Sequence, residues 1–75
     1  MIEGDTLICR HSHRVRHIDI EALFPKKEFF LHPGQQAILL GVVGDEFQVG
    51  RLELIGGELD GLRVATGMLE FFDKV

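Results

Sequence analysis

The residues best suited to chemistry fall in one segment, 9–17. It holds the only cysteine of the chain, three of its four histidines and three arginines, with no acidic residue. Alternate side chains of an extended strand point to opposite faces, so this segment would present a thiol and imidazoles on one face and guanidinium groups on the other. The first face belongs to Cys9, His11, His13 and His17, and the second to Arg10, Arg14 and Arg16.

A metal site is one interpretation of the first face. His11 and His13 form a His-x-His pair, whose alternate imidazoles can converge above a strand as zinc ligands. Cys9, His17 or His32 could supply a third ligand. Structural zinc sites usually carry Cys-x-x-Cys spacing, which a single cysteine cannot provide. We therefore favour a solvated strand and predict no metal and no cofactor, with zinc on His11, His13 and Cys9 as the alternative.

The arginine side of the segment allows two kinds of partner. Arg10, Arg14 and Arg16 could grip the phosphates of RNA or single-stranded DNA, with protonated histidines adding charge below about pH 6.5. Nucleic-acid modules usually add stacking aromatic side chains, but this chain has no Trp and no Tyr, and its six Phe lie outside the segment. We therefore favour pairing with acidic groups, within the chain or on a protein partner, and keep nucleic acid as the alternative.

No residue pattern indicates catalysis. Ser12 is the only serine, and its histidine neighbours would lie on the opposite strand face, out of reach as a general base. Gly56 and Gly57 do not precede the Lys-Ser or Lys-Thr of a phosphate-binding loop. The chain is therefore predicted not to be an enzyme.

Length and composition bound the class of protein. The chain has 75 residues, a net charge of −4 and 45% hydrophobic side chains, which fits one small globular domain spanning 1–75. A single cysteine excludes an intrachain disulfide and suits a reducing compartment. The acidic start lacks the layout of a signal peptide, and the longest apolar run, 37–43, is too short to span a bilayer. We expect a soluble cytoplasmic protein that does not bind membranes.

The elements that must position these residues are mostly strands. In the first half, residues 6–10 and 14–20 look extended, and 19–24 could form one helical turn. Residues 25–31 fit either a helix or a strand, and a turn is expected at 32–34.

The second half predicts an antiparallel meander. Three strands, 36–43, 46–55 and 62–72, are separated by two corners that contain glycine. The apolar residues change phase around Gly50, which predicts a β-bulge there. The expected fold is all-β, or β-dominated with one short helix, arranged as a strongly bent antiparallel meander or small SH3-like barrel.

Apolar residues come in adjacent pairs, among them Phe29-Phe30 and Phe71-Phe72. Neighbours on a strand point to opposite faces, so a single sheet would expose half of each pair, and little sequence is left for a covering helix. We predict that a partner covers the second face, either a second copy in a homodimer or another protein. The expected contact residues are Arg10, Arg14, Arg16, His17, Phe29, Phe30, Phe71 and Phe72.

Two resemblances bear on function. The stretch 54–64, Leu-Ile-Gly-Gly-Glu-Leu-Asp-Gly-Leu-Arg-Val, resembles a motif in small, mostly uncharacterised proteins of phages and mobile elements, which commonly reads Leu-x-Gly-Gly-Pro-x-Asp-Gly. Glu58 stands here in place of the proline, and the likeness centres on the turn Gly56–Gly61. Residues 38–50 are similar in rhythm to the central hairpin of the carbon storage regulator family of RNA-binding dimers, whose C-terminal basic segment is missing here.

The first resemblance implies a hairpin and an accessory role. We therefore expect a non-enzymatic protein-interaction module, encoded by a phage, that binds and modulates or inhibits a host protein. The alternative is a small β domain that binds RNA or single-stranded nucleic acid through the basic patch Arg10–His17.

Overall fold

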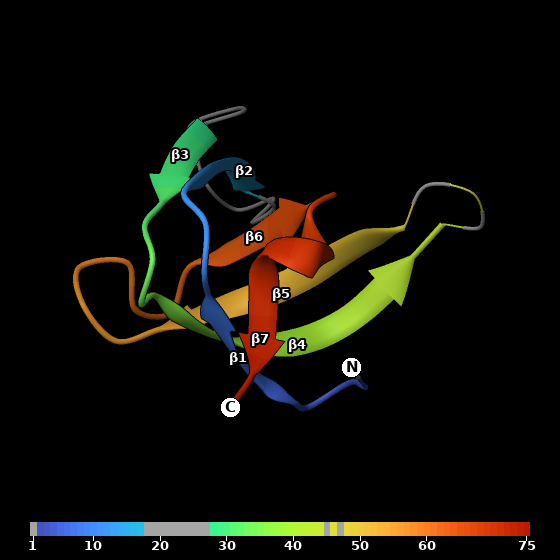
Figure 1. Ribbon diagram of the computed structural model, residues 1–75, viewed down its shortest axis with the longest axis horizontal. Helices are drawn as coiled ribbons and strands as arrows, with labels where there is room; N and C mark the ends of the chain where they lie inside the picture. Colours follow the sequence, from blue (N-terminus) through green and yellow to red (C-terminus); the bar gives the residue numbers. More distant parts are fainter. Residues whose placement is uncertain (1, 18–27, 45, 47) are drawn as a thin grey trace.

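The structure, a computed structural model, describes residues 2–17, 28–44, 46 and 48–75. In this part of the chain seven strands form one antiparallel sheet in the order β3-β2-β6-β5-β4-β1-β7. The sheet curls strongly into a half-barrel (Figure 1), which confirms the expected all-β fold and bent antiparallel sheet. The elements are β1 (Thr6–Cys9), β2 (His13–His17), β3 (Glu28–Leu31), β4 (Gln36–Val43), β5 (Val49–Ile55), β6 (Arg63–Thr66), the 3₁₀ helix η1 (Leu69–Phe71) and β7 (Phe72–Lys74).

The core lies on the inner face of the curled sheet. Apolar residues at alternate strand positions share this face, and the register aligns them in rows across neighbouring strands. One such row joins Leu39, Leu52 and Val64 of β4, β5 and β6. Curling brings the rows against one another and removes them from water. The buried apolar residues are Leu7, Cys9, Val15, Leu31, Ala37, Leu39, Leu52, Leu54, Val64 and Phe72.

The predicted meander is present as β4, β5 and β6, and β4 has the predicted bounds. The bulge prediction was wrong in position. The register passes from Leu39 opposite Leu52 to Gly41 opposite Arg51, so the extra residue is Leu40 of β4 and not Gly50 of β5. Gly50 is buried on the same face as Leu52, so the apolar residues of β5 keep their phase.

The predicted strands 46–55 and 62–72 are shorter in the structure. β5 begins only at Val49, and β6 ends at Thr66, after which the chain turns through η1. The Thr66 hydroxyl oxygen accepts the Met68 N–H at 3.0 Å, which stabilises this turn. The chain then returns as β7, which pairs with β1 at the far side of the sheet.

The ambiguous segment 25–31 ends in a strand, β3. The predicted helical turn 19–24 lies outside the described residues. Within the described part of the chain, η1 is the one helical element, and no helix there has the length and apolar character that a membrane crossing needs.

The corner Gly56–Gly61 links β5 to β6, as predicted. The Asp60 carboxylate accepts the Gly56 N–H at 2.6 Å, and the Gly61 N–H donates to the Leu54 carbonyl at 2.7 Å. Gly56, Gly57 and Gly61 all have positive φ angles, which residues with a Cβ rarely adopt. Local residue types therefore determine this turn.

Curling of the sheet buries many of the residues in the adjacent apolar pairs but leaves others exposed. In the pair Leu39-Leu40, the first residue is buried and the second is half-buried. Phe30, Val42 and Val43 remain exposed. Some apolar side chains of β3 and β4 therefore stay in contact with water.

Candidate functional site

Two of the predicted arginines lie on the outward face of β2. Val15 is 2% exposed and belongs to the core, so strand alternation places Arg14 and Arg16 outside. The register sets Arg14 opposite Phe30 of β3. The guanidinium carbon of Arg14 lies 5.4 Å from the centroid of the Phe30 ring, which is within cation–π range. Because Phe30 is 54% exposed, a cation and an accessible aromatic ring share this face.

A third arginine reaches the same face from a distant part of the sequence. Ala65 of β6 pairs with Arg16 of β2 on one side and with Arg51 of β5 on the other. Strands are about 4.8 Å apart, so the two arginine backbones are about 10 Å apart, with only a methyl side chain between them. Arg51 is exposed and forms no ion pair with the described residues. We call Arg14, Arg16, Phe30, Arg51 and Ala65 the arginine face.

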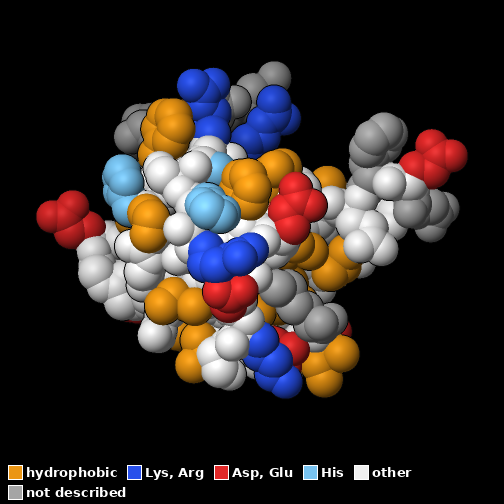
Figure 2. Space-filling view, viewed as in Figure 1, with side chains coloured by type: hydrophobic (Ala, Val, Ile, Leu, Met, Phe, Trp, Pro, Cys, Tyr) orange, Lys and Arg blue, Asp and Glu red, His pale blue; other side chains and the backbone are white. Residues whose placement is uncertain are grey.

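A groove of about 480 Å³ opens beside Ala65. Among the described residues, β2 and β6 pair at Arg16–Ala65 and His17–Val64, and the groove lies where the two strands separate on the side of Val15 and Thr66. Its lining residues are Arg14, Val15, Arg16, Val49, Ala65, Thr66 and Gly67. In the space-filling view, basic side chains gather at the end of the molecule that holds β2 and β3, and the visible acidic side chains lie elsewhere on that face (Figure 2).

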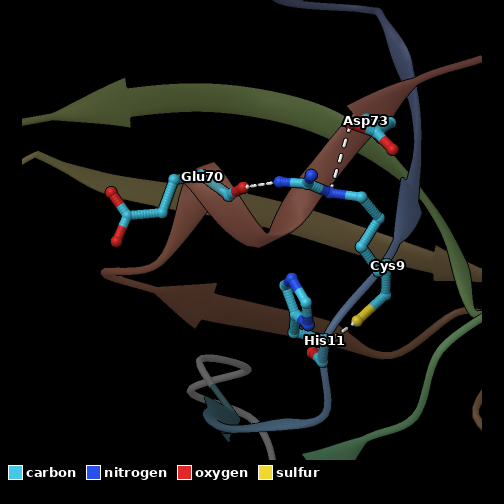
Figure 3. A network of polar contacts seen from close by, with 5 residues as sticks. Cys9, His11, Glu70 and Asp73 are labelled. Carbon is cyan, nitrogen blue, oxygen red and sulfur yellow. Dashed lines mark hydrogen bonds and ion pairs between the residues drawn. The ribbon is translucent and has the colours of Figure 1, made fainter.

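Arg10 belongs to a different part of the molecule. Its Nε lies 3.2 Å from the Asp73 carboxylate, and its guanidinium also donates to the Glu70 carbonyl. Figure 3 shows these two partners on η1 and β7. Arg10 therefore ties the end of β1 to the C-terminal elements and does not join the arginine face.

The phenylalanines predicted as contact residues divide into two groups. Phe72 is 2% exposed and belongs to the core, and Phe71 is partly buried against it. Phe30 is exposed on the arginine face. The side chains of Phe29 and His17 lie outside the described part of the structure. Phe71 and Phe72 therefore pack within the fold, and Phe30 stays accessible at the surface.

Cys9 and His13 are buried side by side, with Sγ 3.9 Å from Nδ1. The Cys9 thiol and the His13 Nδ1 both point at the His11 carbonyl, at 3.1 and 2.8 Å. Because a carbonyl only accepts, Nδ1 carries the proton, and in the neutral imidazole Nε2 then accepts from the Thr66 hydroxyl at 3.1 Å. His13 is therefore not arranged to take the thiol proton, and burial raises the pKa of the Cys9 thiol.

The predicted zinc alternative finds little support in this geometry. The structure brings Cys9 and His13 together, but the ring of His11 lies edge-on to Phe71 with centroids 5.2 Å apart. Among the described residues, no group of three His, Cys, Asp or Glu side chains lies close enough to hold a metal ion. His32, the other suggested ligand, lies in the loop after β3.

That loop borders a second hollow of about 420 Å³, between the β3–β4 loop and the Gly56–Gly61 turn. The Gln35 side chain crosses it and donates to the Ile55 carbonyl at 3.0 Å. Its other lining residues include Pro33, Gly57 and Leu59, and no Asp, Glu, Lys or Arg contributes. The hollow therefore lacks the arginines that the groove beside Ala65 offers for recognition of a charged group.

The comparisons identify no relative. Protein-family models, curated proteins and solved structures give no significant match to this chain. Function is therefore inferred from the geometry of the arginine face.

Proposed function

We propose that the chain is a non-enzymatic interaction module that binds another protein through the arginine face. One observation carries the proposal: the Arg14 guanidinium lies over the exposed Phe30 ring, and Arg16 and Arg51 flank Ala65 on the same face. Arginine and aromatic side chains, phenylalanine among them, are enriched in protein–protein interfaces relative to the rest of the protein surface. Acidic groups of a partner would complement the arginines, and Phe30 would supply apolar contact.

The distribution of charge supports a partner with an acidic surface. The net charge of the chain is −4, yet Arg14, Arg16 and Arg51 share one exposed face. At physiological salt, charges further apart than about 8 Å are largely screened, so the local patch governs the approach of a partner more than the net charge does. Complementary charge then orients the partner and raises the association rate.

The proposal extends to source and assembly. The turn Gly56–Gly61 supports a phage-encoded accessory protein that modulates a host factor, and the free thiol of Cys9 suits the cytoplasm. The exposed Val42 and Val43 support a homodimer. Sedimentation equilibrium tests this last point, and a monomer throughout the micromolar range would contradict it.

Affinity capture from a nuclease-treated host lysate tests the proposed function. The immobilised protein should retain one host protein, and Arg51→Gln should weaken that retention. Lys74→Gln is the matched control, because Lys74 is an exposed cation on β7, at the opposite end of the strand order from β2 and β3. If Arg51→Gln and Phe30→Ala retain the same protein as strongly as Lys74→Gln does, the arginine face is not the binding surface.

A second candidate is binding of single-stranded nucleic acid, which the pairing of Arg14 with Phe30 favours. Phe30 lies outside the basic segment in the sequence, but β3 returns it beside Arg14. Fluorescence anisotropy with a labelled RNA oligonucleotide tests this candidate. Affinity should fall with salt at a log–log slope of about −0.7 for each phosphate neutralised, and an Arg14→Gln/Arg16→Gln variant should lose binding.

A further inference from the structure

We propose that the groove beside Ala65 binds an extended acidic segment of the partner protein, with carboxylates held by Arg16 and Arg51. This inference rests on the proposed function and gives the chemistry of the partner. It starts from the divergence of β2 and β6, whose pairing covers Arg16–Ala65 and His17–Val64. The groove of about 480 Å³ follows directly.

The shape of the groove suits a narrow chain. Its outward surface beside the arginines is formed by small or aliphatic residues, Ala65, Gly67 and Val49. Arg16 lines the groove. Arg51 lies next to it, on the other side of Ala65, whose side chain extends no further than a methyl group. An extended peptide can lie across Ala65 with every second side chain directed at the sheet.

The spacing of the arginines sets the spacing of the carboxylates. The backbones of Arg16 and Arg51 are two strand positions apart, about 10 Å. An extended peptide rises about 3.3 Å per residue and points every second side chain the same way, so acidic residues two positions apart lie about 7 Å apart on one side, a span that the long arginine side chains can match. Each guanidinium can then bind one carboxylate with paired N–H···O bonds.

The two arginines contribute unequally. Arg14 and Arg16 have interaction partners within the chain, so a carboxylate from outside adds to or exchanges with those contacts. Arg51 forms no ion pair with the described residues. Most of the new attraction should therefore come from Arg51.

An acidic peptide fits the groove better than a nucleic acid strand does. Proteins that bind single strands stack successive bases on several aromatic side chains. Phe30 is the one exposed phenylalanine among the described side chains, and Arg14 already lies over its ring. The aliphatic surface of Ala65 and Val49 instead suits the small or apolar residues between two carboxylates.

Direct binding measurements test the inference. The probe is a fluorescent dodecapeptide of alternating Glu and Ala, with the Gln-Ala peptide as the uncharged control and a thymidine oligonucleotide of equal length as the competing polyanion. The Glu-Ala peptide should bind the protein, and the Gln-Ala peptide should not. Arg51→Gln should weaken binding roughly tenfold, Arg16→Gln should weaken it less, and Lys74→Gln should leave it unchanged.

Ala65→Leu provides a test of shape without a change of charge. The larger side chain should fill the gap between the arginines and abolish binding of the Glu-Ala peptide. Far-UV circular dichroism establishes that each variant keeps its β fold. If Ala65→Leu does not fold, Arg51→Gln against Lys74→Gln still decides the question.

Three results would overturn the inference. The first is a Glu-Ala peptide that does not bind, or binds equally to wild type and Arg51→Gln. The second is a thymidine oligonucleotide that binds more tightly with the same dependence on Arg51. The third is self-association that Arg51→Gln abolishes, which would make a second copy the occupant. If the peptide fails but lysate capture still depends on Arg51, the proposed function stands and only the acidic segment is excluded.

Discussion

Gly50→Ala should destabilise the protein by about 1–2 kcal/mol, because the helix η1 covers the sheet at this glycine. A Cβ built at Gly50 would lie 2.5 Å from Cδ2 and 2.8 Å from Cγ of Leu69. Leu69 packs against the core from η1. The absence of a side chain at Gly50 is therefore what allows Leu69 to seat on β5.

The magnitude follows from the size of the overlap. Carbon atoms pack best at about 3.5–4.0 Å, so the new methyl group would approach too closely by about 1 Å. Cγ of Leu69 is among the close atoms, so rotating one methyl away does not relieve the clash. Overpacking of this kind costs about 1–3 kcal/mol, and the lower chain entropy of unfolded Ala offsets about 0.4–1 kcal/mol of it.

Urea unfolding followed by far-UV circular dichroism measures the change, since the chain has no Trp or Tyr for fluorescence. Gly41→Ala is the matched control: Gly41 also lies in a strand, and its Cβ would meet no atom within 4 Å. That variant should unfold within about 0.5 kcal/mol of wild type. In a Leu69→Ala background the Gly50→Ala cost should disappear. Equal stability of the two alanine variants, or an unchanged cost without the Leu69 side chain, would refute this account of the contact.

Three further outcomes are expected. Thr66→Val should cost about 1–3 kcal/mol, because it removes the hydroxyl bonded to His13 Nε2 and the Met68 N–H; Thr66→Ser should recover most of the loss in the same urea assay. Phe72→Ala should cost about 3–5 kcal/mol and Phe30→Ala less than about 1 kcal/mol, and similar losses in thermal unfolding would contradict the roles assigned to them. Because burial raises the pKa of the Cys9 thiol, the folded state holds that proton more tightly than the unfolded state. The protonated thiol makes its full contribution to the free energy of unfolding at neutral pH, and this contribution falls as the pH rises above the ordinary pKa of a thiol. Cys9→Ala should lack this loss of stability at alkaline pH.

Local residue types were sufficient to predict several elements. β4 has the bounds predicted from its apolar run, and the corner Gly56–Gly61 turns where glycines and Asp60 require it. The predicted bulge was placed at Gly50 because Val49 was taken to face the core. Val49 lies on the outer face, so the alternation of β5 continues without a break. Only the pairing with β4 shows that Leu40 is the extra residue.

The candidate site was predicted only in part, since its members meet through strand pairing. Arg14 and Arg16 were identified from their spacing, and alternation placed them on one face. Arg51 was missed because nothing in its own neighbourhood distinguishes it from other exposed cations. The pairing of β6 with both β2 and β5 is what places it across Ala65 from Arg16.

What the amino-acid sequence determined by itself was the all-β class, the strongly bent sheet and the arginines of β2, because periodicity of two and glycine-containing turns act over a few residues. What the tertiary structure alone decided was which of the outward residues become neighbours. Curling placed Phe72 in the core and set Leu69 on Gly50, and strand pairing set Phe30 beside Arg14 and Arg51 near Arg16. These contacts join residues far apart in the chain, and they form only when the closing sheet buries its inner face.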